Sequence, residues 1–466
     1  MVDVPPSSGL FGLADTIVAQ ATAPGRGALA VIRLSGPNAH DVVRAATDRW
    51  PESARQLQLT QVRDAEGRSL DQALVVRYDK PASYTGEDAA ELITHGGFVV
   101  PTTIIAALIA RGARLAEPGE FTRRAVLNGK LDILQAEATG DLIDADSRAA
   151  QSAALRQLDG GLSRRILALR DDVIGLEALI AYSIDFPEED DGPIPPERVL
   201  ESTDRLIASL EQLVATGRAG ELVREGALIV LAGAPNVGKS SLFNALVGRR
   251  RAIVTDIPGT TRDAIEAVID TPAVPLRLVD TAGMRDASDP IERMGVEIST
   301  SYASRAAVLL ACGDSAESFD ALRAVVEGTD APVIAVRTKA DLPLRDAVTI
   351  DDVALRLGAR TTVSVSAETG EGLSTLIDAI VDAVTSEVGG IALDAPLLTH
   401  ERHRFAVGRA LEEVREFRER WREDDLPPPI AAVHLRTAAS ALEDLIGNVD
   451  VEDVLDEVFR RFCVGK

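Results

Sequence analysis

The stretch ALIVLAGAPNVGKSSLFNALVG, residues 227–248, decides the fold class of this chain. A short apolar run is followed by GAPNVGKSS at 233–241 and then by a helix-like segment. These residues match the pattern G-x-x-x-x-G-K-[ST], and a strand before it with a helix after it is the context that confirms a phosphate loop. Backbone N–H groups and the helix N-terminus would cradle phosphates. We expect Lys239 to reach the terminal phosphates and Ser240 to hold Mg²⁺.

Three further motifs stand at the ends of short apolar runs: DTAG at 280–283, TKAD at 338–341 and SAETG at 366–370. Asp280 would lie near the magnesium ion through its water shell, and Gly283 has no Cβ, so it can approach a terminal phosphate closely. Asp341 could accept two N–H bonds from a guanine edge, whereas adenine offers no such donor pair. Together the four signals predict a GTP site.

Composition limits the class of protein. A chain of 466 residues with 46% apolar and 26% charged residues is typical of about three folded domains. The net charge of −24 excludes a protein that coats nucleic acid without specificity, although not a local basic site. Two cysteines exclude a disulfide framework and suit a reducing compartment. The first residues lack a basic n-region, and the apolar stretch 98–110 is too short to cross a bilayer, so we expect a cytoplasmic protein with no membrane partner.

The periodicity predicts a multidomain protein. Residues 1–130 mix strand and helix patterns and read as an α+β domain, and residues 131–225 are helical. Residues 226–387 alternate apolar strands with helices, as in an α/β domain whose parallel sheet is covered on both faces. Residues 388–466 are helical again and end in FCVGK, so the simplest topology is one helical domain in two segments with the α/β domain inserted. In the first domain we expect strands at 16–22, 27–36, 55–62, 72–79 and 89–96, with helices at 40–47 and 101–111.

Other segments extend the match beyond the nucleotide motifs. They are Asn236 in the phosphate loop, TDIPGTTRD at 255–263, DTIVAQATAPGRGALAVIRLSG at 15–36, YTGEDAAEL at 84–92, LNGKLDILQAEA at 127–138 and the terminal FCVGK. Together they closely resemble the MnmE (TrmE) family of tRNA-modification GTPases, which are TrmE-Era-EngA-like potassium-dependent GTPases. The resemblance covers nearly the whole chain and implies an N-terminal folate-binding domain, a helical domain and a P-loop G domain.

The resemblance assigns roles in the G domain. It implies that Asn236, Thr255, Ile257 and Thr260 hold K⁺, and that Thr261 joins Ser240 as a Mg²⁺ ligand. A fixed cation would offset the charge that develops in phosphoryl transfer. The implied GTP-binding residues are Asn236, Val237, Gly238, Lys239, Ser240, Ser241, Thr255, Asp256, Ile257, Pro258, Gly259, Thr260, Thr261, Asp280, Thr281, Ala282, Gly283, Thr338, Lys339, Asp341, Ser366 and Ala367.

The residue that orients the attacking water is also implied by the resemblance. No glutamine follows DTAG, and the family places this duty on a downstream glutamate that matches Glu292 in DPIERMGVE. The alternative interpretation of Glu292 is a solvated carboxylate at a helix N-terminus.

The resemblance also implies chemistry outside the G domain. The N-terminal domain resembles the folate-binding domains of glycine-cleavage T-proteins, and the implied tetrahydrofolate contacts are Arg33, Glu91, Lys130 and Lys466. Cys463 could be a nucleophile, a metal ligand or a packing residue, and the family motif favours a role in the modification reaction. The implied partners are a second copy of the chain, tRNA and an FAD-dependent MnmG (GidA) protein in a heterotetramer or larger assembly.

The implied function is a GTP-driven modification of tRNA. An aminomethyl or carboxymethylaminomethyl group would be added to the fifth ring carbon of the wobble uridine, using a one-carbon unit from tetrahydrofolate. Two alternatives remain open. One is a GTPase switch for ribosome assembly, and the other is a folate aminomethyltransferase with a regulatory G domain and no tRNA role.

Thr338 departs from the usual guanine-binding motif N-K-x-D. The usual asparagine amide can bond the base and also tether the phosphate loop. A threonine hydroxyl is shorter and offers one donor, so we expect at least one of these bonds to be lost while Asp341 keeps the selection of guanine.

Overall fold

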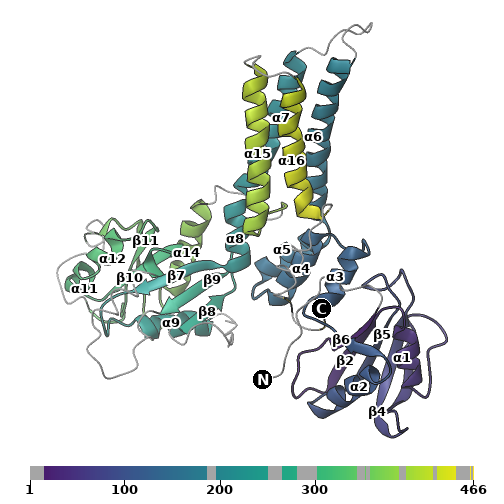
Figure 1. Cartoon of the computed structure of the whole chain (residues 1–466). Coiled ribbons are helices and arrows are strands. Elements are labelled where there is room, and N and C mark those ends of the chain that lie inside the picture. The colour runs from purple at the N-terminus through teal and green to yellow at the C-terminus, as the bar shows by residue number, and fades with distance from the viewer. Residues whose placement is uncertain are drawn as a thin grey trace, which may run out of the picture. The chain divides into compact units, whose positions relative to one another are not determined.

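The computed structural model describes residues 15–185, 196–249, 265–280, 302–343, 352, 357–387, 395–422, 428–447, 462 and 465 (Figure 1). The chain forms two compact units, one of Met1–Gly140 with Ile446–Lys466 and the other of Asp141–Leu445. Among the described helices, none is both long enough and apolar enough to cross a membrane.

The first unit is built on a six-stranded sheet in the order β3-β4-β5-β2-β1-β6. Neighbouring strands are antiparallel except β1 and β6, which are parallel. Side chains of β2 alternate between core and surface, as a half-buried strand requires. The strands are β1 (Thr16–Gln20), β2 (Leu29–Ser35), β3 (Gln58–Arg63), β4 (Ser69–Tyr78), β5 (Ala89–His95) and β6 (Ala113–Leu115).

The helices of this unit are α1 (Ala39–Ala45), α2 (Val99–Ile109) and α3 (Glu120–Leu127). The α+β class expected from the sequence is confirmed, and each expected strand and helix overlaps an observed one. The sequence did not predict β6 and α3, because β6 has three residues and α3 begins after a left-handed Gly119 with no side-chain cap.

A buried network of charges holds α3 against the start of β1. The Arg124 side chain is 3% exposed, and its guanidinium donates to the Asp15 carbonyl (2.9 Å) and carboxylate (2.6 Å) and to Glu120 (2.9 Å). Glu87 lies 3.2 Å away, and Arg114 also bonds both Asp15 and Glu120. Burial disfavours the charge of Arg124, but the carboxylates outweigh burial and raise the pKa of this guanidinium. The network joins β1, β6 and α3 to the loop between β4 and β5.

The end of the chain returns to the first unit. The Phe462 ring would lie 3.2 Å from a Cβ on Gly140 of α4 (Ile133–Asp144). Gly465 has φ +103°, and a Cβ there would lie 2.4 Å from the Gln20 carbonyl oxygen. The compact units therefore divide within α4 and place Ile446–Lys466 with the N-terminal sheet, whereas the sequence predicted a boundary at 130 and one helical segment over 388–466.

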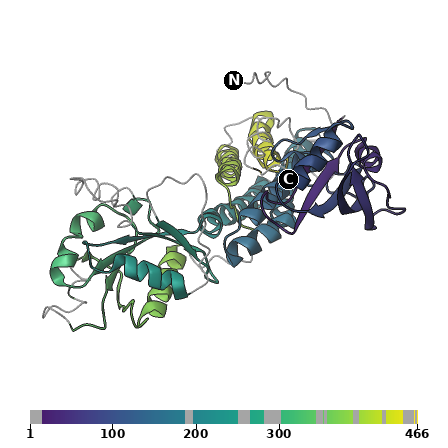
Figure 2. The same ribbon diagram turned by 90° about the horizontal axis from the view of Figure 1, so that it is seen from below.

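The second unit contains four long helices that run side by side (Figures 1 and 2). They are α6 (Gly161–Asp185), α7 (Pro196–Ala215), α15 (Glu401–Arg422) and α16 (Pro428–Ile446), with the shorter α5 (Arg148–Leu158) and α8 (Gly217–Glu225) beside them. The helical region that the sequence predicted to run on from residue 131 is interrupted twice. The Ser147 hydroxyl caps α5 by accepting from Ala150 N (3.1 Å), and Gly160, with φ +77°, separates α5 from α6.

The remainder of this unit is a six-stranded sheet in the order β12-β11-β10-β7-β9-β8. All neighbours are parallel except β8 and β9. The inserted α/β domain expected from the sequence is therefore confirmed, with one antiparallel edge strand that the sequence did not predict. The strands are β7 (Ala227–Ala232), β8 (Ile265–Ile269), β9 (Leu276–Asp280), β10 (Val308–Gly313), β11 (Val333–Arg337) and β12 (Thr361–Ser364).

Helices cover both faces of this sheet, as its nearly all-apolar strands require. One face packs against α8, α9 (Lys239–Arg249) and α14 (Leu373–Glu387). The other packs against α11 (Ala316–Asp320) and the segment that contains α12 (Arg323–Glu327).

The two chain segments that lead into and out of the sheet are fastened at one place. Asp141 accepts from Arg224 at the end of α8 (3.0 Å) and contacts His400 just before α15 (2.9 Å). Leu398 N donates to the Thr216 hydroxyl (3.1 Å). Burial opposes ionisation of Asp141, but the bonds from His400 and Arg224 outweigh it and lower the pKa of this carboxyl. The insertion is therefore anchored by polar bonds to α4.

We predict that Arg124→Ala lowers the free energy of unfolding of the first unit by about 3–5 kcal/mol, because Glu87 loses this buried cation and Asp15 and Glu120 keep only Arg114. The chain has two tryptophans, so in a Trp421→Phe background the fluorescence of Trp50 reports urea unfolding of this unit alone. Arg68→Ala is the control, because that side chain is 75% exposed and should leave the urea midpoint unchanged. Equal shifts of the urea midpoint in Arg124→Ala and Arg68→Ala would contradict the role of the buried charge network in stabilising the first unit.

Candidate functional site

The described nucleotide motifs gather at one edge of the parallel sheet. The phosphate loop follows β7, Asp280 ends β9, TKAD follows β11 and SAETG follows β12. Strands that run parallel present their carboxyl ends at the same edge, where ligands bind in open α/β sheets. The structure thus brings together Asn236, Val237, Gly238, Lys239, Ser240, Ser241, Asp280, Thr338, Lys339, Asp341, Ser366 and Ala367.

The phosphate loop has the backbone that an anion cradle needs. Asn236 and Gly238 have φ of +62° and +99°, in the left-handed region, and α9 begins at the next residue, Lys239. Gly233 passes so close to β10 that a Cβ would lie 2.5 Å from the Cys312 carbonyl oxygen. Lys239 is 6% exposed, and its ammonium donates to the carbonyls of Gly233 (2.8 Å) and Ala234 (2.9 Å). A cation is thus held inside the loop that would enclose phosphates.

Two oxygen ligands suited to Mg²⁺ lie beside this loop. Ser240 is exposed at the first turn of α9, and Asp280 is 2% exposed at the end of β9, paired in register with Leu231. A hydroxyl and a carboxylate are the hard donors that Mg²⁺ prefers. The other expected nucleotide, potassium and catalytic residues lie outside the described residues: Thr255, Asp256, Ile257, Pro258, Gly259, Thr260, Thr261, Thr281, Ala282, Gly283 and Glu292.

A cavity of about 630 Å³ opens between α9 and the ends of β11 and β12, and Thr338, Lys339, Asp341 and Ala367 line it. The Ser366 hydroxyl bonds the Asp341 carboxylate and lowers its pKa, so this exposed side chain is held ionised. An ionised carboxylate is an acceptor only, which suits the two N–H donors of a guanine edge.

The structure shows what the threonine in TKAD does. The Thr338 hydroxyl is buried and donates to the Val237 carbonyl of the phosphate loop at 2.5 Å, with the Gly313 carbonyl at 3.3 Å. The tether between the base-binding segment and the phosphate loop is therefore present. An asparagine could bond both the base and the phosphate loop. Threonine makes the bond to the phosphate loop and has no second side-chain proton for the base.

Asp314 belongs to this site and was not expected from the sequence. Lys339, which has φ +55°, donates from its ammonium to the Asn236 carbonyl (2.9 Å) and to the Asp314 carboxylate (2.8 Å). Asp314 directly follows β10, so its place after an apolar strand was the signal that could have revealed it. Cys312, on β10 itself, is a core residue, and burial raises the pKa of its thiol to about 12.

A second polar cluster lies on the sheet of the first unit. Arg33 on β2 and Glu91 on β5 are paired in register, and their side chains form an ion pair at 2.8 Å. The Tyr78 hydroxyl donates to Glu91 (3.2 Å), and burial together with that carboxylate raises the pKa of Tyr78. The Arg33 guanidinium lies 5.5 Å from the centre of the Tyr84 ring and 5.8 Å from that of Phe121. Tyr78, Tyr84 and Phe121 were not expected at this cluster, although Tyr84 is the first residue of the YTGEDAAEL segment.

The other residues expected at this cluster are only partly described. Lys130 follows α3 and donates to the Pro81 carbonyl (3.2 Å) in the loop that also carries Tyr84. Lys466 and Cys463 lie outside the described residues, although Phe462 and Gly465 on either side of Cys463 contact the first unit.

Two family models match the chain. One, described as the GTP-binding protein TrmE N-terminus, matches residues 16–130, and the other, described as the MnmE helical domain, matches residues 133–463. Three curated relatives are each called tRNA modification GTPase MnmE. That of Heliobacterium modesticaldum is 40% identical, with 97% of this chain and 99% of the relative covered. That of Aquifex aeolicus is 39% identical (97% and 100%), and that of Akkermansia muciniphila is 41% identical (97% and 99%).

The chain belongs to the MnmE family. The family assignment made from the sequence motifs is confirmed, as are the multidomain fold and the identity of the enzyme as a GTPase of tRNA modification. The nucleotide motifs at the sheet edge are the candidate GTP site of this MnmE-family enzyme.

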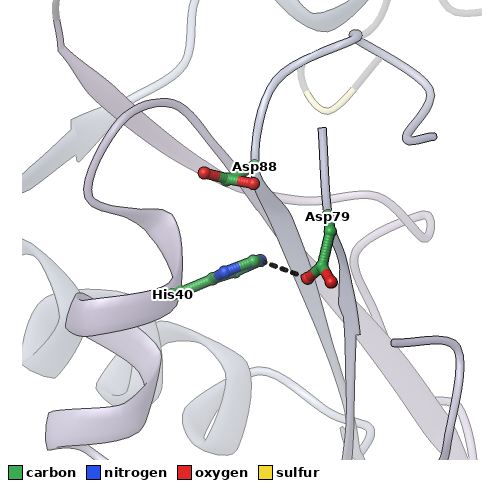
Figure 3. Close-up of side chains that lie close together, drawn as sticks. All are labelled: His40, Asp79 and Asp88. Atoms are coloured by element: carbon green, nitrogen blue, oxygen red, sulfur yellow. Dashed lines mark ion pairs between the residues drawn. The ribbon is translucent and has the colours of Figure 1, made fainter. Parts of the chain in front are cut away.

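A third cluster in this MnmE-family chain resembles a metal site but has another role. His40, Asp79 and Asp88 lie close together where β4 ends and β5 begins (Figure 3). The His40 Nε2 atom is 3.2 Å from the Tyr78 carbonyl and 3.1 Å from the Ala89 carbonyl. A carbonyl only accepts, so Nε2 carries a proton and offers no lone pair to a metal ion. We assign His40 a structural role, in which it satisfies the two carbonyls at the end of the β4–β5 ladder.

We predict that Asp341→Asn weakens GDP binding about ten- to a hundredfold, because bonds from guanine to a charged acceptor are lost. Xanthine carries a carbonyl where guanine has its amino group, so the new amide can donate to it, and binding of xanthosine diphosphate should improve. Calorimetric titration with both nucleotides measures the change. Glu368→Gln, an exposed carboxylate in the same cavity wall, should keep the preference for GDP. An Asp341→Asn protein that still prefers GDP would remove Asp341 from base recognition.

Proposed function

We propose that this enzyme modifies the wobble uridine of certain tRNAs in the cytoplasm, in a cycle driven by GTP hydrolysis and stimulated by K⁺. It would add an aminomethyl or carboxymethylaminomethyl group to the fifth ring carbon, with a tetrahydrofolate derivative as the one-carbon source and an FAD-dependent MnmG (GidA) protein as its partner. The observation that carries the proposal is the match to MnmE relatives over 97% of the chain.

The described residues support the nucleotide part of the proposal. Lys239 and the backbone of the phosphate loop would bind the phosphates, and Asp341 would select guanine. Mg²⁺, held by Ser240 with Thr261 and with Asp280 nearby, would neutralise phosphate charge. Asn236, exposed and in a left-handed conformation at the mouth of the loop, would join Thr255, Ile257 and Thr260 in holding K⁺.

The folate part rests on the cluster around Arg33. A pterin edge presents N–H donors that suit the Glu91 carboxylate, which keeps further lone pairs beside its bond to Arg33. Tyr84 lies at the Arg33 guanidinium and is 37% exposed, so it would offer a ring face to a flat heterocycle, whereas Phe121 is fully buried behind Arg33 and would support that guanidinium from the core. Lys130, which bonds the Pro81 carbonyl of the loop that carries Tyr84, and Lys466 would suit the glutamyl carboxylates of a folate.

The partner part rests on surface features. Leu29, Phe98 and Val99 are 63%, 73% and 71% exposed, and they lie near one another because Leu29 pairs with His95 just before α2. An exposed apolar patch is typical of an interaction surface and supports a homodimer through the first unit. The net charge of −24 supports a partner that supplies much of the basic surface for tRNA.

We predict that Asn236→Ala abolishes the stimulation of GTP turnover by K⁺ while GTP still binds, because the backbone cradle remains. Turnover is measured in potassium and in sodium chloride at equal ionic strength. Glu292→Ala is the matched comparison, since loss of a group that orients water should slow single-turnover hydrolysis and leave GTP affinity and the potassium-to-sodium ratio unchanged. Full potassium stimulation in Asn236→Ala would exclude this residue from the ion site.

The whole proposal is tested by the wobble nucleosides of a strain that lacks the gene. Mass spectrometry of hydrolysed tRNA should show loss of the modified uridine, restored by the native chain and by Cys312→Ala but not by Cys463→Ser. The Cys463→Ser protein should keep its GTPase rate. Unchanged wobble uridines in the deletion strain would refute the function, whereas full restoration by Cys463→Ser would return Cys463 to a packing role.

A further inference from the structure

The side chain of Thr338 has a single proton to donate, the one on its hydroxyl, and the structure shows which acceptors take it. The Thr338 hydroxyl lies 2.5 Å from the Val237 carbonyl and 3.3 Å from the Gly313 carbonyl. Both oxygens are acceptors only, so the proton is used by the backbone in either case. The Thr338 backbone N–H is also committed, because it donates to the Gly313 carbonyl at 3.0 Å.

The side chain cannot turn toward the cavity at low cost. Thr338 is 3% exposed, and its Cβ would lie 3.7 Å from a Cβ on Gly238, so it is packed against the phosphate loop. A β-branched side chain has few favourable rotamers. Turning it away would leave the Val237 carbonyl without this bond inside a buried contact.

The neighbouring cation is committed in the same way. The Lys339 ammonium donates to the Asn236 carbonyl (2.9 Å) and to the Asp314 carboxylate (2.8 Å). Its charge therefore lies at the phosphate loop and at the end of β10.

Guanine presents two chemically different edges. The N1–H and N2–H₂ groups are donors and suit Asp341, whereas N7 is an acceptor and needs a donor from the protein. Position 338 is where the usual motif supplies an amide, and here the only hydroxyl proton is already used.

We propose that, among the described residues, this site selects guanine through its N1 and N2 donors and leaves N7 unrecognised, so that 7-deazaguanine nucleotides bind as tightly as guanine nucleotides. Thr338 is the residue that determines this specificity. The inference rests on the proposed function only in that the cavity must take a guanine nucleotide.

The native chain provides the first test. In 7-deaza-GDP a C–H group replaces N7, so calorimetric titration compares the two ligands with no change in the protein. We expect the dissociation constants of GDP and 7-deaza-GDP to agree within about twofold, below the effect of one hydrogen bond. A dissociation constant for 7-deaza-GDP at least fivefold higher than that for GDP would overturn the proposal.

Two variants assign the effect to Thr338. In Thr338→Asn the amide has two protons, one for the Val237 carbonyl and one for N7, so GDP should bind roughly two- to tenfold more tightly than 7-deaza-GDP. Thr338→Ser is the matched control, since it keeps one hydroxyl proton and should bind both ligands equally. Equal dissociation constants of the Thr338→Asn variant for GDP and 7-deaza-GDP would show that Thr338 does not determine whether N7 is recognised.

A titration with ADP separates this inference from the proposed function. A native chain that binds ADP as tightly as GDP would refute the guanine site itself. A chain that prefers GDP to ADP but also discriminates against 7-deaza-GDP would refute only the claim about N7.

Discussion

The described nucleotide site depends on one constraint, which is that β7, β9, β10, β11 and β12 run parallel and end at the same edge of the sheet. Each strand delivers a different polar group to that edge. The phosphate loop, Asp280, Asp314, the TKAD segment and the SAETG segment are far apart in the chain, and no local contact could assemble them. Helices on both faces bury the apolar strands, so the edge is positioned by the core and not by the loops themselves.

Hydrogen bonds between the loops then fix their relative positions. Thr338 ties the base-binding segment to Val237, and Lys339 ties it to Asn236 and Asp314. The non-glycine residues Asn236 and Lys339 adopt positive φ, a strained conformation that persists where surrounding contacts determine it. The same contacts that order the site also use up the donors of Thr338 and Lys339. The proposed specificity of the guanine pocket would in this way be a consequence of how its loops are tied.

The features that could be predicted from the sequence are those that short contiguous motifs encode. The phosphate loop and the expected strands of both sheets depend on local spacing and apolar runs, and these elements were found, whereas the role of TKAD in binding guanine stays a prediction. Tyr78 and Phe121 were not expected, because each takes its place through contacts with residues distant in the chain, and Asp314 was overlooked although it directly follows an apolar strand. The return of Gly465 to β1 also depends on a close approach between residues distant in the chain, and only the family resemblance, which places Lys466 with Arg33, Glu91 and Lys130, implied it. The edge strand β8 was not expected, although β9 and β11 have the same length and were.

The central claim is that separate strand ends form one guanine-nucleotide site, and backbone hydrogen exchange of the full chain tests it most directly. Exchange is followed by mass spectrometry with and without saturating GDP. The account predicts that GDP slows exchange together in 233–241, 338–341 and 366–367, and that ADP at the same concentration does not. Protection confined to the phosphate loop, or the same protection by ADP, would contradict it.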